Sequence, residues 1–122
     1  MAKPTYDDQN IFAKILRGEI PNKTVFENDH VLAFEDIQPQ AKYHILIIPK
    51  NAYTDIQDFL ENASDAEKLA YFDAVKEIAK QLEIDETGYR LIANCRAHSR
   101  QDVPHLHFHM LGGEQLPRLE AK

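Results

Sequence analysis

The sequence of 122 residues has a single cysteine, no excess of basic residues and no long apolar run. Cys95 cannot form an intramolecular disulfide, and residues 1–8 lead into no apolar segment of the signal-peptide kind. Both features predict a cytoplasmic protein. The longest strongly apolar run, residues 45–48, is far too short to span a bilayer, so we expect no membrane partner.

Acidic residues outnumber basic ones by 20 to 14, which gives a net charge of −6 with neutral histidines. The sequence lacks the basic stripe that releases counterions from nucleic-acid phosphates, so we expect no nucleic-acid partner. A small anionic substrate held by local donors stays compatible with this charge. The sequence also lacks repeats, low-complexity tracts and linkers. It therefore predicts one domain, residues 1–122, with short flexible N-terminal and C-terminal tails.

The apolar pattern predicts an α+β fold: an antiparallel sheet of about five strands, one long helix packed on it and a short N-terminal helix. The short helix is expected over residues 11–17, with Gly18 at its end. The strands should follow one another in hairpin order, and the third should be central because it is almost continuously apolar. They are expected at Thr24–Glu27, Val31–Glu35 and residues 43–48, 89–93 and 103–111.

Ser64 and Glu67 have the spacing of a capping box, which predicts the start of the long helix between the third and fourth strands. Apolar residues then recur at steps of three and four. We expect them to form one stripe that packs on the sheet, made of Leu69, Phe72, Val75, Ala79 and Leu82.

Three of the six histidines, His105, His107 and His109, alternate with large apolar residues in the last strand. Successive side chains of a strand point to opposite faces, so the three imidazoles should share one face. The other face should pack beneath the long helix with Leu106, Phe108 and Met110. Clustered imidazoles lower one another's pKa, and a neutral imidazole flanked by donors suits nucleophilic attack on phosphorus. The strand therefore predicts a phosphate-handling site with His107 as the nucleophile.

Two other interpretations of the three histidines compete with this one. A polar strand face that holds them by chance is improbable in a chain with six histidines. Two strand histidines two residues apart can both bind zinc, but three along a straight strand spread too far to close on one ion. No acid or cysteine pair stands at a familiar ligand spacing. We therefore expect no metal and no cofactor.

The pattern His-x-His-x-His followed by two apolar residues resembles the signature of the histidine-triad (HIT) superfamily. Residues 10–21, 33–41 and 44–50 also resemble the Hint branch, the purine nucleoside phosphoramidases, and Asn94 precedes His105 at the family's spacing. The resemblance covers about residues 9–113. It implies a HIT-like fold and a homodimer joined through the long helix and the strand at residues 89–93.

The resemblance also implies the activity. The protein should be a nucleotide hydrolase or transferase that cleaves nucleoside 5′-phosphoramidates or related conjugates of purine nucleotides and releases the nucleoside monophosphate. By position, His107 would form a covalent nucleotidyl-histidine, while His105 would support it and a strand carbonyl would hold its Nδ1–H. His109 would donate to the phosphate oxygens, and His44 matches a fourth histidine that borders the site.

The nucleotide contacts are likewise implied by the resemblance. Asp36 matches the carboxylate that accepts both ribose hydroxyls, and Asn94 would bond to the phosphate or to the ribose 5′ oxygen. Gln101 and Asp102 belong to the loop that serves the phosphate. The apolar positions around the base are Phe12, Ile20, Phe34 and Ile37.

The sequence departs from the family at Asp102, in a loop that commonly runs Gly-Gln-Ser or Gly-Gln-Thr. An ionised Asp102 can only accept hydrogen bonds and would repel a phosphate. We expect it to pair with Arg100 outside the pocket, while the Gln101 and Asp102 backbone N–H groups serve the phosphate. A protonated Asp102, or one paired with a histidine, is the alternative. Pro104 should mark an edge position or the start of the last strand.

The tail, residues 114–120, lacks the aromatic C-terminus that many Hint proteins extend toward the partner subunit's site, so the preference for a leaving group stays open. Two other functions compete with the phosphoramidase. Asp102 favours a catalytically weak nucleotide-binding or scaffold protein. A dinucleoside polyphosphate hydrolase of the Fhit-like branch is the second.

Overall fold

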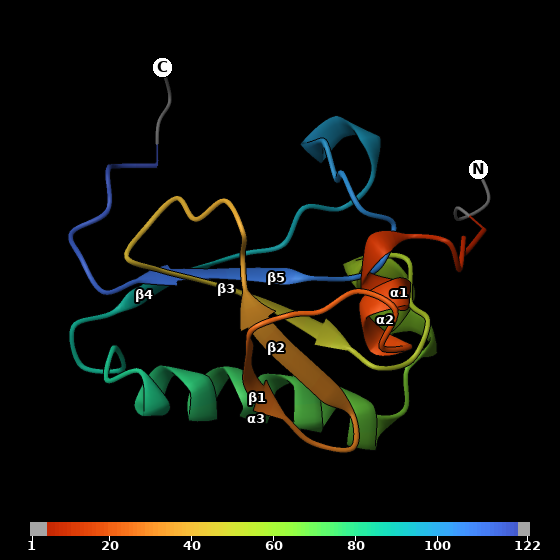
Figure 1. Cartoon of the computed structure of the whole chain (residues 1–122), viewed down its shortest axis with the longest axis horizontal. Coiled ribbons are helices and arrows are strands. Elements are labelled where there is room, and N and C mark those ends of the chain that lie inside the picture. The colour runs from red at the N-terminus through yellow and green to blue at the C-terminus, as the bar shows by residue number, and fades with distance from the viewer. Residues whose placement is uncertain (1–4, 120–122) are drawn as a thin grey trace.

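A computed structural model describes residues 5–119 and shows a mixed α/β fold around one antiparallel sheet (Figure 1). The five strands lie in the order β1-β2-β3-β5-β4, so β3 is central as predicted. Their bounds are β1 (Thr24–Glu27), β2 (Val31–Glu35), β3 (Tyr43–Pro49), β4 (Tyr89–Ile92) and β5 (Phe108–Gly112). Hairpin order ends after β3, because the last strand inserts between β3 and β4 and pairs with both.

The helices are α1 (Ile11–Leu16), α2 (Ile56–Asn62) and α3 (Asp65–Gln81), with a short 3₁₀ helix, η1, at Ala97–Ser99. The predicted N-terminal helix is confirmed. The Asn10 side chain caps α1 by accepting from the Ala13 N–H at 2.9 Å. Gly18 follows the helix end at φ +79°, a left-handed conformation that glycine adopts without strain.

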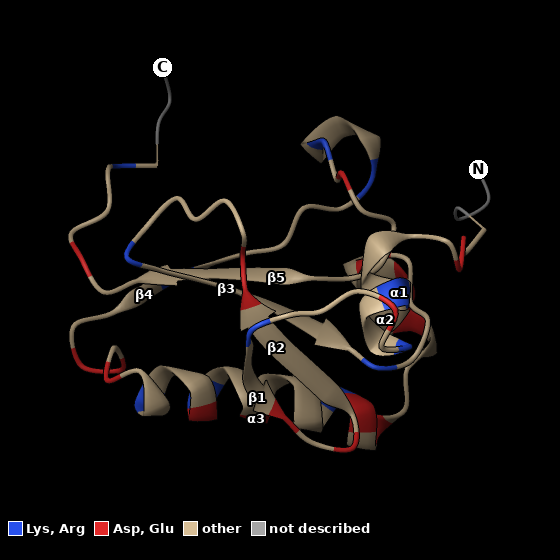
Figure 2. Ribbon diagram, viewed as in Figure 1, with Lys and Arg blue, Asp and Glu red and all other residues tan. Residues whose placement is uncertain are grey.

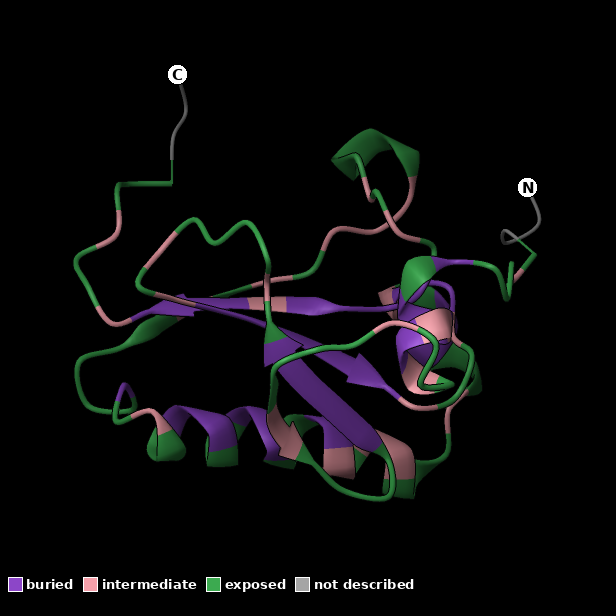
Figure 3. Cartoon of the chain, viewed as in Figure 1, coloured by how far each residue is buried: buried purple, intermediate pink, exposed green. Residues whose placement is uncertain are grey.

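The long helix α3 begins at the predicted capping box, in which Ser64 and Glu67 bond to each other's backbone N–H groups. The predicted apolar stripe is wrong in part, because Leu69 and Phe72 are 65% and 51% exposed. The buried residues of α3 are Tyr71, Ala74, Val75, Ile78 and Ala79. The Tyr71 hydroxyl donates to the Ile47 carbonyl of β3 at 2.6 Å and so fixes which side of the helix faces the sheet. Figure 3 shows the buried side of α3 turned toward the sheet and the exposed side turned away.

The last strand begins at Phe108, five residues later than the predicted start at residue 103. The backbone ahead of it bonds elsewhere: the His105 N–H donates to the Val103 carbonyl and the Leu106 N–H to the Tyr53 carbonyl. Pro104 therefore lies in a turn that leads into an interior strand, and its expected edge position is wrong. The alternation of faces is confirmed, since Leu106, Phe108 and Met110 join the core beneath α3.

One helix, α2, was absent from the elements that the sequence predicts. Its N-cap is Asp55, whose carboxylate accepts from the Asp58 N–H at 2.8 Å. Phe59 of α2 is fully buried in the same core as α3. The signal in the sequence was the Asp55 cap, since Asp is among the preferred N-cap residues.

The two faces of the sheet carry separate apolar cores. Beneath α3, Ile45 and Ile47 of β3 pack with the helix. On the opposite face, α1 covers only part of β2 and β3, through Phe12 and Ile15. This incomplete cover leaves the face that carries the histidines open beside α1.

Lys and Arg lie scattered over the described chain rather than gathered along one face (Figure 2). Within residues 5–119, no helix is long and apolar enough to cross a membrane. The predicted flexible tails fall partly on residues 1–4 and 120–122, which lie outside the described residues.

Candidate active site

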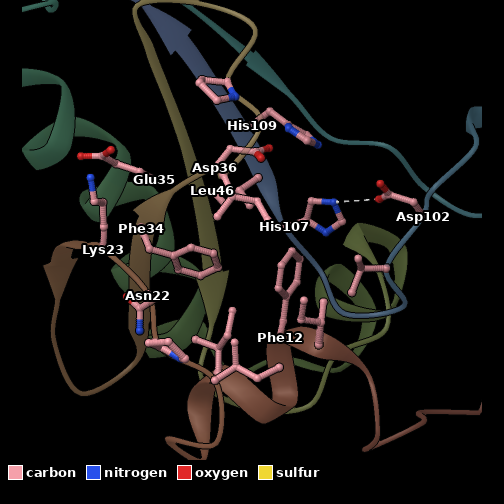
Figure 4. Close-up of a pocket in the computed structure, with 17 residues that line it drawn as sticks. Phe12, Asn22, Lys23, Phe34, Glu35, Asp36, Leu46, Asp102, His107 and His109 are labelled. Atoms are coloured by element: carbon pink, nitrogen blue, oxygen red, sulfur yellow. Dashed lines mark ion pairs between the residues drawn. The ribbon is translucent and has the colours of Figure 1, made fainter.

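Three neighbouring strands place side chains side by side on the open face of the sheet. Phe34 of β2 pairs with Leu46 of β3, which pairs with His109 of β5. With α1, this row forms a pocket of about 780 Å³, which is large enough for a small organic ligand. The site residues predicted from the sequence that line the pocket are Phe12, Ile20, Phe34, Asp36, Ile37, Asp102, His107 and His109 (Figure 4).

The other predicted site residues lie outside the lining of this pocket. His44 and His105 are buried, and each is hydrogen-bonded. Asn94 is half-buried and lies two residues after the end of β4. The Gln101 side chain bonds to backbone atoms of Arg96, Thr54 and Val103. The Gln101 N–H donates to the Arg96 carbonyl, so the expectation that this N–H serves a phosphate is wrong.

His107 has a fixed tautomer. Its Nδ1 lies 2.8 Å from the His105 carbonyl oxygen, and because a carbonyl only accepts, Nδ1 carries the proton. The Nε2 atom therefore keeps its lone pair and faces the pocket. The Phe12 ring packs edge-on against the imidazole, with 5.0 Å between ring centroids, and holds its orientation. The predicted carbonyl partner of the His107 Nδ1–H is thus present.

His109 has the opposite tautomer, set by a chain of hydrogen bonds. The Gln40 N–H donates to His44 Nδ1 at 3.0 Å, so the neutral His44 carries its proton on Nε2. His44 Nε2 lies 2.9 Å from His109 Nδ1 and donates to it. The neutral His109 must then carry its own proton on Nε2. The pocket therefore holds one imidazole that can attack and one that can donate.

His105 supports His107 from outside the pocket. Its Nε2 donates to the Pro49 carbonyl at 2.9 Å, which leaves Nδ1 to accept from the Tyr6 hydroxyl at 2.7 Å. Both ring nitrogens are thereby used, and the carbonyl that holds His107 is fixed in place. Tyr6 was missed from the sequence, because it lies 99 residues from its partner and no spacing pattern joins the two.

Burial keeps the four imidazoles neutral. The pKa of His105 and of His109 is lowered to about 4, mainly by loss of solvent and in smaller part by repulsion from neighbouring histidines. Burial also lowers the pKa of His107 and of His44, while the nearby Asp36 acts in the opposite direction on both. An uncharged His107 is the form that can attack.

Asp102 faces the pocket, and the expected pairing with Arg100 outside it is wrong. Its Oδ1 lies 3.7 Å from His107 Nε2, and its side chain is 83% exposed (Figure 4). A distance of 3.7 Å is too long for a hydrogen bond, in keeping with an unprotonated Nε2. Within residues 5–119, no lysine or arginine forms an ion pair with this carboxylate.

Asp36, His44 and His109 form the one group that could hold a metal ion among the described residues, with ligand atoms within 4.8 Å of one another. No spacing pattern along the chain predicts this cluster, because its members come from three separate segments. A metal on His44 would need the lone pair of Nε2, but that nitrogen carries the proton when Nδ1 accepts from Gln40. The hydrogen-bonded chain therefore accounts for these residues better than a metal site does.

A neutral imidazole with a free Nε2, beside a second imidazole that donates, defines a site for nucleophilic chemistry on an anionic group. The HIT domain profile matches residues 17–116, and the chain belongs to the HIT family.

Two curated relatives and one solved structure illustrate the similarity. An uncharacterized HIT-like protein of Azospirillum brasilense is 53% identical over 100% of this chain and 99% of its own length. The purine nucleoside phosphoramidase of Escherichia coli K12 is 45% identical over 94% of this chain and 97% of its own length. The crystal structure of a HIT family hydrolase from Legionella pneumophila superposes with a TM-score of 0.80 at 44% identity, over 89% of this chain and 96% of that one.

Proposed function

We propose that this chain is a nucleotide hydrolase or transferase that cleaves nucleoside 5′-phosphoramidates or related nucleotidyl conjugates. The reaction runs through a covalent nucleotidyl-histidine on His107 and releases the nucleoside monophosphate. One observation carries the proposal: the His107 Nδ1–H is tied to the His105 carbonyl, so its free Nε2 faces a pocket of nucleotide size. The E. coli relative named as a purine nucleoside phosphoramidase points to the same chemistry.

In the first step, the tautomers of His107 and His109 have different roles. His107 Nε2 attacks the α-phosphorus, and the P–N bond breaks with its electron pair leaving on nitrogen. The departing nitrogen takes a proton from solvent, while the His109 Nε2–H donates a hydrogen bond to the phosphoryl oxygens and His44 donates to the other side of the His109 ring. The nucleotidyl-imidazolium keeps its Nδ1–H on the His105 carbonyl, which stabilises the charge that develops.

In the second step, water attacks the phosphorus of the intermediate. The P–N bond to His107 breaks, its electron pair returns to Nε2, and the nucleoside monophosphate leaves. The proton lost by the attacking water goes to solvent, which balances the proton taken in the first step and restores the starting state. No metal is required for either step.

The rest of the pocket suits a nucleoside. Phe12, Phe34 and Leu46 form an apolar wall for a base, and Ile20 and Ile37 extend it. Asp36 lies at the border between this wall and the histidines (Figure 4). An ionised carboxylate has two acceptor oxygens for the two vicinal ribose hydroxyls, so we assign Asp36 to the sugar.

Trapping the intermediate tests the proposal. The protein is mixed with an α-³²P-labelled purine nucleoside phosphoramidate, quenched within one turnover and separated from free nucleotide. Label should stay on the wild type and on His98→Ala, a control in the exposed helix η1, and should be absent from His107→Ala. A label that remains on the His107 variant would contradict the covalent step.

A catalytically weak nucleotide-binding protein is the second candidate, because Asp102 places a carboxylate beside the nucleophile. That function requires tight binding of a nucleoside monophosphate with no labelled intermediate and no turnover. The trapping experiment therefore distinguishes the two candidates directly.

We further propose a homodimer that joins through the outer side of α3 and through β4. Large apolar side chains are exposed on both elements: Leu69, Phe72, Tyr89 and Leu91. Exposed apolar groups of this kind commonly mark protein interfaces. Light scattering at micromolar concentration should give a dimer mass, and Phe72→Asp should shift it to a monomer. Leu60→Ser, which changes an exposed leucine of α2, is the matched control and should stay dimeric.

A further inference from the structure

On the loop side of the pocket, a carboxylate lies beside the free nitrogen of His107. Asp102 Oδ1 lies 3.7 Å from His107 Nε2. A phosphate bound for attack by His107 would lie close to this negative charge. Such an arrangement raises the energy of the substrate complex unless another part of the substrate gains from the carboxylate.

The loop that carries Asp102 is anchored on both sides. Arg96 donates to the buried carboxylate of Asp55, the cap of α2, at 2.8 Å. Gln101, directly before Asp102, donates from its amide nitrogen to the carbonyls of Thr54 and Val103. Arg96 and Arg100 also hold left-handed backbone conformations, with φ +65° and +61°. The position of Asp102 is therefore built into the fold.

The charges in the pocket leave this carboxylate uncompensated. Among the described lining residues, Lys23 is the one lysine or arginine, against Glu35, Asp36 and Asp102 as acids. Figure 4 shows Lys23 beside Glu35, across the pocket from Asp102. A substrate group with positive charge or an N–H donor would fit beside Asp102, and a second phosphate would not.

The pocket also fixes which part of a substrate reaches Asp102. Phe34 and Asp36, the residues assigned to the nucleoside, lie on one side of His107, and Asp102 lies on the other (Figure 4). With the phosphorus at His107 and the nucleoside against Phe34, the leaving group extends toward Asp102. The carboxylate is 83% exposed, so it stands where a leaving group departs to solvent.

We propose that Asp102 selects the leaving group, favouring amines, above all amines with a further positive charge, over alcohol, carboxylate and phosphate leaving groups. This inference rests on the proposed function and names its substrate class: nucleoside 5′-phosphoramidates of cationic amines. The carboxylate accepts a hydrogen bond from the P–NH group. When the P–N bond breaks, the nitrogen takes the electron pair and a proton from solvent and leaves as an amine, and Asp102 accepts from its N–H and attracts any further positive charge that the amine carries.

The same contact disfavours other leaving groups. A bridging ester oxygen has lone pairs and no hydrogen, so it cannot donate to a carboxylate that can only accept. A carboxylate or phosphate leaving group carries negative charge and is repelled by Asp102. Dinucleoside polyphosphates, whose leaving group is a nucleoside phosphate, should therefore be the poorest substrates.

The test uses three adenosine 5′-phosphoramidates whose alkylamines end in an ammonium, a hydroxyl or a carboxylate, together with diadenosine polyphosphate. For each, kcat/KM is measured with the wild type, Asp102→Asn and Asp102→Ser. Asp29→Asn, in the turn between β1 and β2, removes the same charge far from the pocket and is the control. The wild type should prefer the ammonium substrate over the carboxylate one by about tenfold or more, because charge-assisted contacts are worth roughly that factor.

Both Asp102 variants should bring that ratio close to one, and Asp29→Asn should keep it. Raising the salt concentration should reduce the preference of the wild type, because an exposed charge is screened. If the wild type turns over the phosphoramidates and the ratio is the same in Asp102→Asn, the selection is wrong and the proposed function stands. If the wild type turns over none of the four substrates, the proposed function itself fails.

Discussion

The two faces of the sheet are built from the same strands but differ in what covers them. Beneath α3, Ile47, Phe108 and Met110 are buried by a helix of 17 residues. On the other face, α1 has six residues and packs on Phe34 and Leu46, which are buried yet line the pocket. The alternating side chains of β5 therefore enter a dry core on one side and an open pocket on the other.

The difference shows how one strand can serve both stability and chemistry. The covered face gains free energy from apolar burial. The open face holds imidazoles that are buried enough to stay neutral, yet His107 Nε2 still reaches the pocket. Changes on the α3 face should therefore affect stability, and changes on the pocket face should affect turnover and binding.

The largest effect is expected at the nucleophile. His107→Ala should lower kcat by at least about 10³-fold, because no other described imidazole presents a free Nε2 lone pair to the pocket. Binding of a nucleoside monophosphate should stay measurable by calorimetry, since the apolar wall is intact. A variant that keeps about a tenth of the wild-type rate would contradict nucleophilic catalysis by His107.

On the opposite face, Ile78→Ala should reduce the free energy of unfolding by about 2–5 kcal/mol, because Ile78 is fully buried between α3 and the sheet. KM at the pocket should stay unchanged in the folded protein. Glu77→Ala, an exposed neighbour on the same helix, is the control and should change stability by less than about 0.5 kcal/mol. Urea unfolding measures both variants. A large change in KM for Ile78→Ala would show that the two faces are not independent.

Lowering the pH should reduce the free energy of unfolding, because the buried imidazoles are neutral in the folded protein. The pKa of His105 falls from 6.5 to about 4 on folding, so the unfolded chain binds its proton first as the pH falls. The stability from this group is complete above pH 6.5 and is lost as the pH falls toward about 4. For a group this buried, the loss is about 3 kcal/mol.

His109 has the same direction of shift, and its pKa also falls to about 4. Urea unfolding at about pH 8 and about pH 5 should therefore show a clear loss of stability at the lower pH, and His109→Gln should reduce that loss. Equal free energies of unfolding at both pH values would contradict neutral, buried histidines.

A smaller and more selective effect is expected at Asp36. Asp36→Ala should weaken the binding of a ribonucleoside monophosphate by roughly 1.5–3 kcal/mol for each charge-assisted hydrogen bond lost. The matching 2′,3′-dideoxy ligand should bind the variant and the wild type alike, because it offers no hydroxyl. Calorimetry with the two ligands decides the matter. If the variant binds both ligands more weakly by the same amount, Asp36 acts on His44, whose Nε2 lies 3.3 Å from its Oδ2, and does not bind the sugar.

Local patterns in the sequence predicted most of the fold. Alternation in residues 105–110 predicted that Leu106, Phe108 and Met110 enter the core while His107 and His109 face the pocket, although β5 begins only at Phe108. The capping box at Ser64 and Glu67 located the start of α3 for the same reason: its partners are neighbours in the chain. The resemblance to the HIT family implied a strand carbonyl for the His107 Nδ1–H, and the structure shows that it is the His105 carbonyl, two residues away.

Contacts between distant segments could not be read in this way. In α3, the Tyr71 hydroxyl donates to the Ile47 carbonyl of β3, and with this side of the helix on the sheet Leu69 and Phe72 face outward. Asp102 faces His107 on a loop that Arg96 and Gln101 anchor to Asp55, the cap of α2, and to the Thr54 carbonyl beside it, and α2 is missing from the predicted set. Such contacts depend on which surfaces meet when the chain packs, and the spacing of residues along the sequence does not predict them.

The sequence by itself therefore determined the family and the strand alternation, and it predicted His107 as the nucleophile. The tertiary structure alone decided the tautomers of His44, His105 and His109, because each depends on a partner that only packing brings within hydrogen-bond distance. It also decided that the charge of Asp102 lies beside the nucleophile. Local backbone geometry follows from neighbouring residues. Which ring nitrogen of a histidine carries the proton, and which charges lie beside it, follow from the whole fold.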